Sequence, residues 1–223
     1  MKKKINVGII GRGKWGKKFI PILKKKARVK FILDSKSKIP KKIENLKWVF
    51  VLTNNKKHEY FVNYFIKKKI NVFCEKPLTE NFLTSQKLFD IAKNLKVKLY
   101  VSDIELYKNK RLKIRKENVI TRSKYYPKKQ KIRSILFKLF YHDIYLLGRH
   151  FINKKIISKK IQFKKNVLSI KLLLNNKKSY NFTYNLKSKK KLHQINDQNM
   201  RKFSGNPLSI MIDKILFKKF SNS

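Results

Sequence analysis

Residues 8–16 of the chain read GIIGRGKWG. The whole sequence has only 6 glycines among 223 residues, and Gly8, Gly11, Gly13 and Gly16 all lie in this stretch. Glycine is the residue that permits tight turns and close approach of the backbone to another group. Its concentration here indicates a segment that requires glycine.

The neighbouring segments predict the structural context of these glycines. Residues 5–10 (INVGII) form a short apolar run typical of a buried strand. Residues 14–26 carry apolar side chains at helical spacing, interrupted by Pro21, and residues 29–34 (VKFILD) predict a second strand that ends in an acid. Strand, turn, helix and strand make one βαβ unit, which should be parallel and right-handed.

The spacing of Gly11, Gly13 and Gly16 fits the pattern G-x-G-x-x-G. In that pattern the first glycine permits the turn, the second lets the backbone approach a pyrophosphate, and the third allows the helix to pack closely on the strand. The pyrophosphate would lie at the helix N-terminus near Lys14, and Asp34 is placed to bind a ribose 2′-hydroxyl. The alternative is a glycine turn with a packing role only.

The rest of the first half continues the alternation of strands and helices. Further strands are predicted at 48–53, 71–75 and 97–102, and helices at 57–69 and 81–95. This order predicts an α/β fold: a Rossmann-type, doubly wound parallel sheet in a dinucleotide-binding domain over residues 1–103.

The second half has a different pattern. Alternate residues are apolar in 166–174 and again in 179–187, with a turn (NNKK) between them. This predicts an antiparallel hairpin with one buried face. We therefore expect residues 104–223 to form a smaller α+β domain, with a role in substrate binding or oligomerisation.

The composition is strongly basic. Lys and Arg total 59 against 12 Asp and Glu, and only 8 of the 59 are Arg. A selected nucleic-acid surface would use more Arg, because guanidinium suits phosphates and base edges better than ammonium does. The abundance of Lys, Ile, Asn and Phe with very little Ala also fits an AT-rich coding sequence. We expect non-specific nucleic-acid contact only.

The sequence gives little evidence on the cellular compartment and none for a membrane segment. The single cysteine, Cys74, excludes an intrachain disulfide and fits a reducing compartment; its simplest interpretation is a small buried hydrophobe. The apolar run after the N-terminal MKKK is too short for a signal peptide, and no apolar stretch approaches a membrane span. A soluble, cytoplasmic protein is expected.

Four segments together resemble one known family. These are GIIGRGKWG (8–16), VFVLTNNKKH (49–58), NVFCEKPLT (71–79) and FYHDIYLLG (140–148). Their order is similar to that of the Gfo/Idh/MocA family of NAD(P)-dependent oxidoreductases, which includes glucose-fructose oxidoreductase and inositol dehydrogenase. The resemblance implies NAD or NADP as cofactor, hydride transfer at a hydroxyl or carbonyl carbon of a sugar, polyol or nucleotide sugar, and a homo-oligomer.

Carried over by position, the resemblance implies a set of site residues and no metal site. Those near the dinucleotide would be Gly11, Arg12, Gly13, Lys14, Trp15, Gly16, Asp34, Thr53, Asn54, His58, Glu75 and Lys76. The catalytic residues would be Lys76, in the loop EKP, and His142. Taking a hydroxyl proton as a carbonyl forms is chemistry that a lysine can perform if its pKa is lowered. The alternatives are a solvated Lys76 and a packed core His142.

The chain departs from the family at one informative position. At 100° per residue, one stripe of the expected helix contains Lys131, Ser134, Lys138, His142, Tyr145 and Arg149. The family has an acid one turn before the histidine, where this chain has Lys138. This departure leaves open a rival hypothesis, a catalytically reduced relative that still binds dinucleotide. The basic composition leaves open a second one, a nucleic-acid-binding protein in which the fold is incidental.

Overall fold

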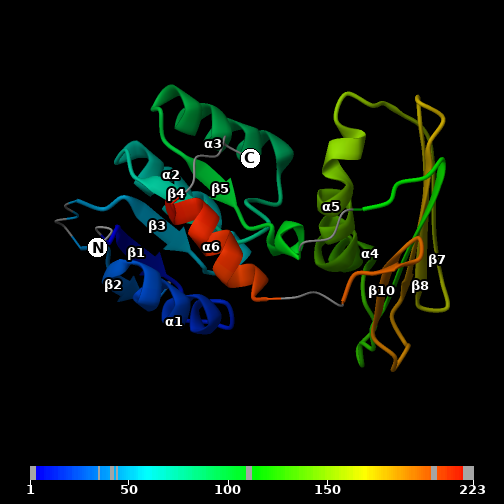
Figure 1. Ribbon diagram of the computed structural model, residues 1–223, viewed down its shortest axis with the longest axis horizontal. Coiled ribbons are helices and arrows are strands. Elements are labelled where there is room, and N and C mark those ends of the chain that lie inside the picture. Colours follow the sequence, from blue (N-terminus) through cyan, green and yellow to red (C-terminus); the bar gives the residue numbers. More distant parts are fainter. Residues whose placement is uncertain are drawn as a thin grey trace. The chain divides into compact units, whose positions relative to one another are not determined.

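The computed structural model gives the conformation of most of the chain. Its described residues are 4–34, 36–40, 43, 45–108, 112–201 and 205–217. Contacts divide the chain into two compact units, which are described separately. The first runs to Ile104 and includes the C-terminal helix α6 (Pro207–Phe217), and the second comprises Glu105–Gly205 (Figure 1).

Helix α6 groups with the first unit, whereas the sequence expectation placed residues 104–223 together. The Asp213 carboxylate accepts hydrogen bonds of 2.6 Å from Nζ of Lys26, the last residue of α1 (Gly16–Lys26). Most of the apolar side chains of α6 are also buried. A segment distant in the sequence thus completes the first unit.

The first unit contains a five-stranded parallel sheet in the order β2-β1-β3-β4-β5. Its strands are β1 (Asn6–Ile10), β2 (Arg28–Leu33), β3 (Trp48–Val51), β4 (Asn71–Cys74) and β5 (Leu99–Val101). Besides α1 and α6, its helices are α2 (Asn55–Lys67) and α3 (Phe82–Asn94). The predicted doubly wound parallel sheet is confirmed.

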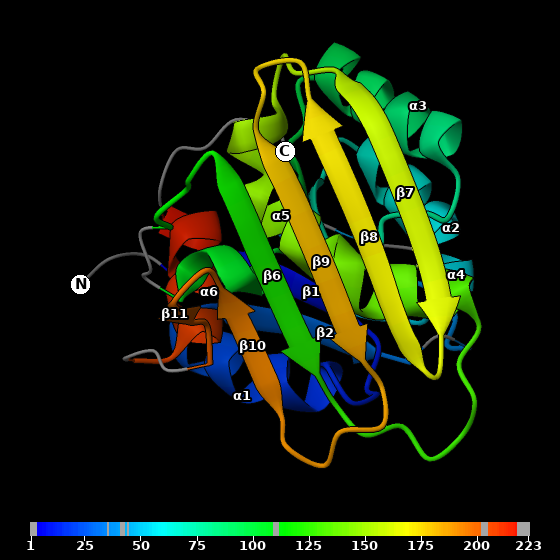
Figure 2. The same cartoon turned by 90° about the vertical axis from the view of Figure 1, so that its right-hand side faces the viewer.

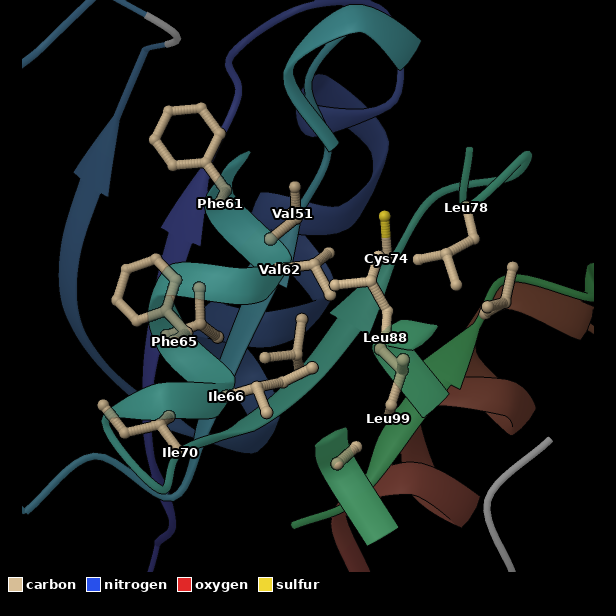
Figure 3. Close-up of a cluster of buried hydrophobic side chains, with 14 of the residues drawn as sticks. Val51, Phe61, Val62, Phe65, Ile66, Ile70, Cys74, Leu78, Leu88 and Leu99 are labelled. Carbon is tan, nitrogen blue, oxygen red and sulfur yellow. The ribbon is translucent and has the colours of Figure 1, made fainter. Parts of the chain in front are cut away.

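Successive side chains of the buried strands point to opposite faces of this sheet. On one face, Val51 and Cys74 pack with the apolar side of α2, including Val62 (Figure 3). On the other face, Phe19 of α1 packs against two aromatic rings of the sheet, with a centroid separation of 5.2 Å to Phe73. Helices on both faces explain why these strands are continuously apolar.

The second unit contains a six-stranded mixed sheet in the order β11-β10-β6-β9-β8-β7 (Figure 2). Its strands are β6 (Glu117–Ser123), β7 (Ile156–Lys164), β8 (Val167–Leu174), β9 (Ser179–Asn185), β10 (Leu192–Ile195) and β11 (Gln198–Asn199). Only the β6–β9 pair is parallel among these pairings of described residues. The predicted hairpin is confirmed, since β8 and β9 pair antiparallel with Leu168 opposite Tyr184.

Helical segments cover the apolar face of this sheet. They are α4 (Ile132–Ile135), the π-helix η2 (Leu136–Phe140) and α5 (Tyr141–Phe151); a 3₁₀-helix, η1 (Ile104–Tyr107), precedes β6 in the chain. Buried residues of α4, η2 and α5, such as Leu147, pack in one cluster with Ile170 and Phe182 of the sheet. Within the described part of the chain, no helix is long and apolar enough to cross a membrane.

A buried carboxylate joins four elements of the second unit. Asp143 of α5 is fully buried and accepts hydrogen bonds from Nε and Nη2 of Arg122 (2.8–2.9 Å), from the Tyr184 hydroxyl (2.9 Å) and from Nε2 of His193 (2.9 Å). Burial would raise the pKa of Asp143, but the charge of Arg122 and these hydrogen bonds lower it. The ionised carboxylate therefore ties α5 to β6, β9 and β10.

The helical stripe expected from 100° per residue is wrong across η2. Residues 136–140 form a π-helix, which has more residues per turn than an α-helix. Residues before it are therefore rotated about the helix axis relative to residues after it. Nζ of Lys138 contacts Oε1 of Gln130 at 3.1 Å and lies 5.8 Å from the ring centre of Tyr126. The side chain of Lys138 is therefore held by residues that precede the helix.

Asp143→Asn should destabilise the protein by about 3–5 kcal/mol, because Arg122 would keep its charge in a buried site without the carboxylate that accepts its hydrogen bonds. The matched control is Asp197→Asn, which removes one partner of the exposed pair with Arg115 and should cost less than about 1 kcal/mol. Urea unfolding at neutral pH measures both values. Similar losses in the two variants would contradict the structural role of Asp143.

Candidate functional site

The predicted site residues of the first unit gather where the strand order reverses. The chain leaves β1 toward β2 on one side, while β3 lies on the other. The amide of Leu52 donates to the carbonyl of Ile10 at 2.7 Å, and the amide of Gly11 donates to that of Leu33 at 2.7 Å. Loops that diverge from such a point leave a crevice at the carboxyl edge of the sheet, where open α/β sheets bind ligands.

The three glycines of the turn are required for different structural reasons. Gly11 has φ +113°, and a Cβ there would lie 2.4 Å from the carbonyl oxygen of Leu52. A Cβ on Gly16 would lie 2.1 Å from the carbonyl oxygen of Gly11. A Cβ on Gly13, in contrast, would meet no heavy atom within 4 Å. The fold explains Gly11 and Gly16, whereas Gly13 faces open space that a side chain would fill.

The N-terminus of α1 follows this open space. Its first turn contains no acid and Trp15 provides no side-chain cap, while its last turn consists of lysines. The amide groups and the helix dipole therefore favour an anion at this end. Trp15 packs edge-on to Phe19 at 6.4 Å, and Nη2 of Arg12 donates to the carbonyl of Ile32 at 2.7 Å. Lys14 is exposed.

Asp34 follows the end of β2 and its side chain is held by a turn. Oδ1 accepts hydrogen bonds from the amides of Lys36 (2.7 Å) and Ser37 (2.9 Å). These bonds, with a smaller contribution from the charge of Arg12, lower the pKa of Asp34. The Ser37 side chain also hydrogen-bonds the carboxylate. Asp34 is exposed, so a ligand can still reach its carboxylate.

A pocket of about 440 Å³ adjoins this turn. It is lined by Lys36, Ser37, Lys38, Ile39, Lys57, Tyr60, Phe61 and Tyr64. Sequence reasoning did not identify these residues as a site. The available signal was the spacing of Lys57, Tyr60 and Tyr64, which places three polar or amphipathic side chains on one face of α2.

His58 lies beneath the crevice. It is fully buried, with Nδ1 2.8 Å from the carbonyl oxygen of Pro77 and Nε2 3.1 Å from that of Thr53. Burial lowers the pKa of His58 and favours the neutral ring, which can donate only one of these bonds. The geometry gives His58 the role of a brace between two loops, while Thr53 is half-buried and Asn54 exposed beside it.

Glu75 and Lys76 follow the end of β4. The Glu75 side chain is buried, and Oε1 has no hydrogen-bond partner within the described residues. Burial raises the pKa of Glu75 to about 7, against the opposing effects of a hydrogen bond from Ser102 and the charge of Lys76. Lys76 is half-buried and precedes a cis peptide bond to Pro77. A carboxyl that titrates near neutrality thus adjoins the predicted catalytic lysine.

His142 belongs to the second unit. It lies on α5, half-buried, with its ring edge-on to Tyr141 at 6.2 Å. Its charge would act on Glu105 of η1, whose pKa is lowered because Lys108, Arg122 and His142 together outweigh the effect of burial. Within the described residues, no group of three His, Cys, Asp or Glu side chains is placed to hold a metal ion.

Comparisons with known proteins agree with this architecture. Residues 25–103 match the model of GFO_IDH_MocA, described as an oxidoreductase family with an NAD-binding Rossmann fold. The matched segment begins after the glycine turn, so the evidence from the geometry of Gly11–Gly16 is separate from it. A search of curated proteins finds no match.

Several solved structures share the fold. UDP-N-acetylglucosamine 3-dehydrogenase GnnA from Acidithiobacillus ferrooxidans has a TM-score of 0.78 at 11% identity, covering 96% of this chain and 88% of that one. The dehydrogenase MviM from Clostridium difficile scores 0.68 at 21% identity, covering 86% and 74%. GenD2 from gentamicin A biosynthesis, in complex with NAD, scores 0.69 at 14% identity, covering 87% and 70%. The resemblance to Gfo/Idh/MocA oxidoreductases is confirmed.

Glu75→Gln should remove a pH dependence of stability. The ordinary carboxyl pKa is 4.5 and that of folded Glu75 is about 7, so between these values only the native state keeps the proton. Stability therefore falls as pH rises through this window, by a total of about 3 kcal/mol. The variant should be more stable than the wild type above pH 7 and equal to it near pH 4.

Thermal unfolding of both proteins across this pH range measures the difference. Asp103→Asn is a useful comparison, because burial also raises the pKa of Asp103, to about 6, while Tyr100 donates to it at 2.5 Å. If the wild type were instead more stable than Glu75→Gln above pH 7, the ionised carboxylate would have a favourable charged partner in the folded protein.

Proposed function

We propose that the protein is an NAD(P)-dependent oxidoreductase acting on a hydroxyl or carbonyl carbon of a sugar, polyol or nucleotide sugar. The observation that supports this best is the open space at Gly13, before the uncapped N-terminus of α1, at the point where the strand order reverses. The turn has the shape of a pyrophosphate cradle that any side chain at position 13 would fill.

The residues present fit a dinucleotide along the carboxyl edge of the sheet. The amides at the start of α1 would hold the pyrophosphate. The exposed Asp34 carboxylate would accept a hydrogen bond from a ribose hydroxyl, and Tyr60 and Tyr64 of the adjoining pocket offer apolar ring surface to the adenine. The ionised Asp34 would repel a 2′-phosphate, which favours NAD, although Lys36 reduces this preference.

The nicotinamide, when bound, accepts or supplies the hydride. This chain must supply the proton transfer. We assign that role to Lys76, whose amine would take the hydroxyl proton as the carbonyl forms. Glu75, with a pKa of about 7, can exchange a proton beside it. His142 is assigned to substrate orientation or proton relay.

The substrate class rests on likeness to other proteins. The relative from Acidithiobacillus ferrooxidans is by its name a dehydrogenase of UDP-N-acetylglucosamine, and the GenD2 structure contains NAD. A homo-oligomer is also part of the proposal. Ile156, Ile157 and Ile161 of the sheet's terminal strand β7 are at least half exposed, and such apolar strands favour association.

Gly13→Val should abolish binding of NADH while leaving the fold intact, because the new side chain enters open space that the pyrophosphate needs. Fluorescence titration with NADH and NADPH measures affinity, and thermal unfolding checks the fold. Asp34→Asn should reduce the difference between the two cofactors. If wild type and Gly13→Val bound NADH equally well, the glycine turn would not be part of the cofactor site.

Lys76→Met should eliminate turnover while changing NADH affinity by less than about 3-fold, the pattern expected of a group needed in the transition state. The matched control is Lys56→Met, at an exposed position in the first turn of α2. Turnover is measured by NADH absorbance on sugar substrates selected by thermal shift. If Lys76→Met kept full activity, another residue would have to be the proton acceptor.

A further inference from the structure

The second unit contains a basic pocket that the proposed function does not use. It has a volume of about 250 Å³ and lies where β6 and β10 pair, with Ser123 opposite Leu192. Six of its nine lining residues are basic: Lys108, Arg122, Lys124, Lys191, His193 and Arg201. Five of the nine lining residues are Lys or Arg, against 59 of 223 in the whole chain, so cations are concentrated here beyond its general basic character. Burial lowers the pKa of His193 and favours its neutral ring.

Few carboxylates are available to balance these cations. Asp143 is shared by Arg122 and His193, and Glu105 pairs with Lys108 at 2.9 Å. Lys124, Lys191 and Arg201 take part in no ion pair with a described residue. Like charges gathered around one concave surface repel each other, and a bound anion relieves that repulsion.

Hydrogen bonds within the protein hold both guanidinium groups that line the pocket. Arg122 is largely buried and uses Nε and Nη2 on Asp143, which leaves the N–H groups of Nη1 outside that contact. Arg201 donates from Nη1 to the carbonyl of Lys191. Because these planar donors are already ordered, less side-chain entropy is lost when they bind a phosphate oxygen.

We propose that this pocket binds the phosphate or diphosphate group of a small molecule. All of its lining residues belong to the second unit, so the site does not depend on the dinucleotide turn. A concave pocket of this volume suits a compact anion, whereas single-stranded nucleic acid is bound along an extended groove with aromatic stacking surfaces.

The test uses inorganic diphosphate, titrated by calorimetry at constant ionic strength. All proteins carry Gly13→Val, which blocks diphosphate from the glycine turn. Lys124→Gln/Lys191→Gln removes two pocket charges, and Lys67→Gln/Lys68→Gln removes two exposed charges at the end of α2 as the matched control. The pocket variant should bind at least about 10-fold more weakly, and the control within about 2-fold of the parent.

Equal weakening in the two double variants would overturn the proposal, because it would assign binding to the general surface charge. Inorganic phosphate, titrated in parallel, distinguishes a single-phosphate site from one that needs both groups. A DNA oligonucleotide that loses affinity in the pocket variant, while diphosphate does not, would overturn the proposal in favour of nucleic acid. NADH titration of the pocket variant with Gly13 restored tests the proposed function separately.

Discussion

The second unit depends on one buried negative charge, in a chain where negative charge is scarce. The chain has 12 carboxylates for 59 lysines and arginines, so a buried cation can rarely find a counterion. Asp143 meets this constraint by accepting hydrogen bonds from three side chains at once. The helical layer and three strands of the second unit depend on this one ionised group, because each of its partners would otherwise lose its acceptor in a buried site.

The same constraint affects ligand binding. A strongly positive chain attracts anions over its whole surface, so charge alone cannot define a site. Geometry must do so: Gly13 leaves space before an uncapped helix, and Arg122 presents a guanidinium that Asp143 has already oriented. In both places a rigid backbone or a buried hydrogen bond reduces the entropy lost on binding. Long, mobile surface lysines offer no such advantage.

Features that depend on local periodicity could be predicted from the sequence. The glycine spacing, the buried parallel strands and the hairpin with Leu168 opposite Tyr184 all follow from residues close together in the chain. The Asp143 network could not be predicted, because its partners are 21, 41 and 50 residues away. The docking of α6 on the first unit likewise brings together distant residues: Lys26 and Asp213, which form an ion pair, are 187 residues apart.

The surroundings of Lys138 and His142 also include features that no regular helical pattern predicts. The π-helix over residues 136–140 lies between the two ends of the predicted stripe, and the side chain of Lys138 contacts Oε1 of Gln130, a residue that precedes the helix. The acid within electrostatic reach of His142 comes from η1 instead, as Glu105. Since Glu105 is also paired with Lys108, its charge is retained in a largely buried position. The second unit therefore provides His142 with a carboxylate that no helical pattern around the histidine contains.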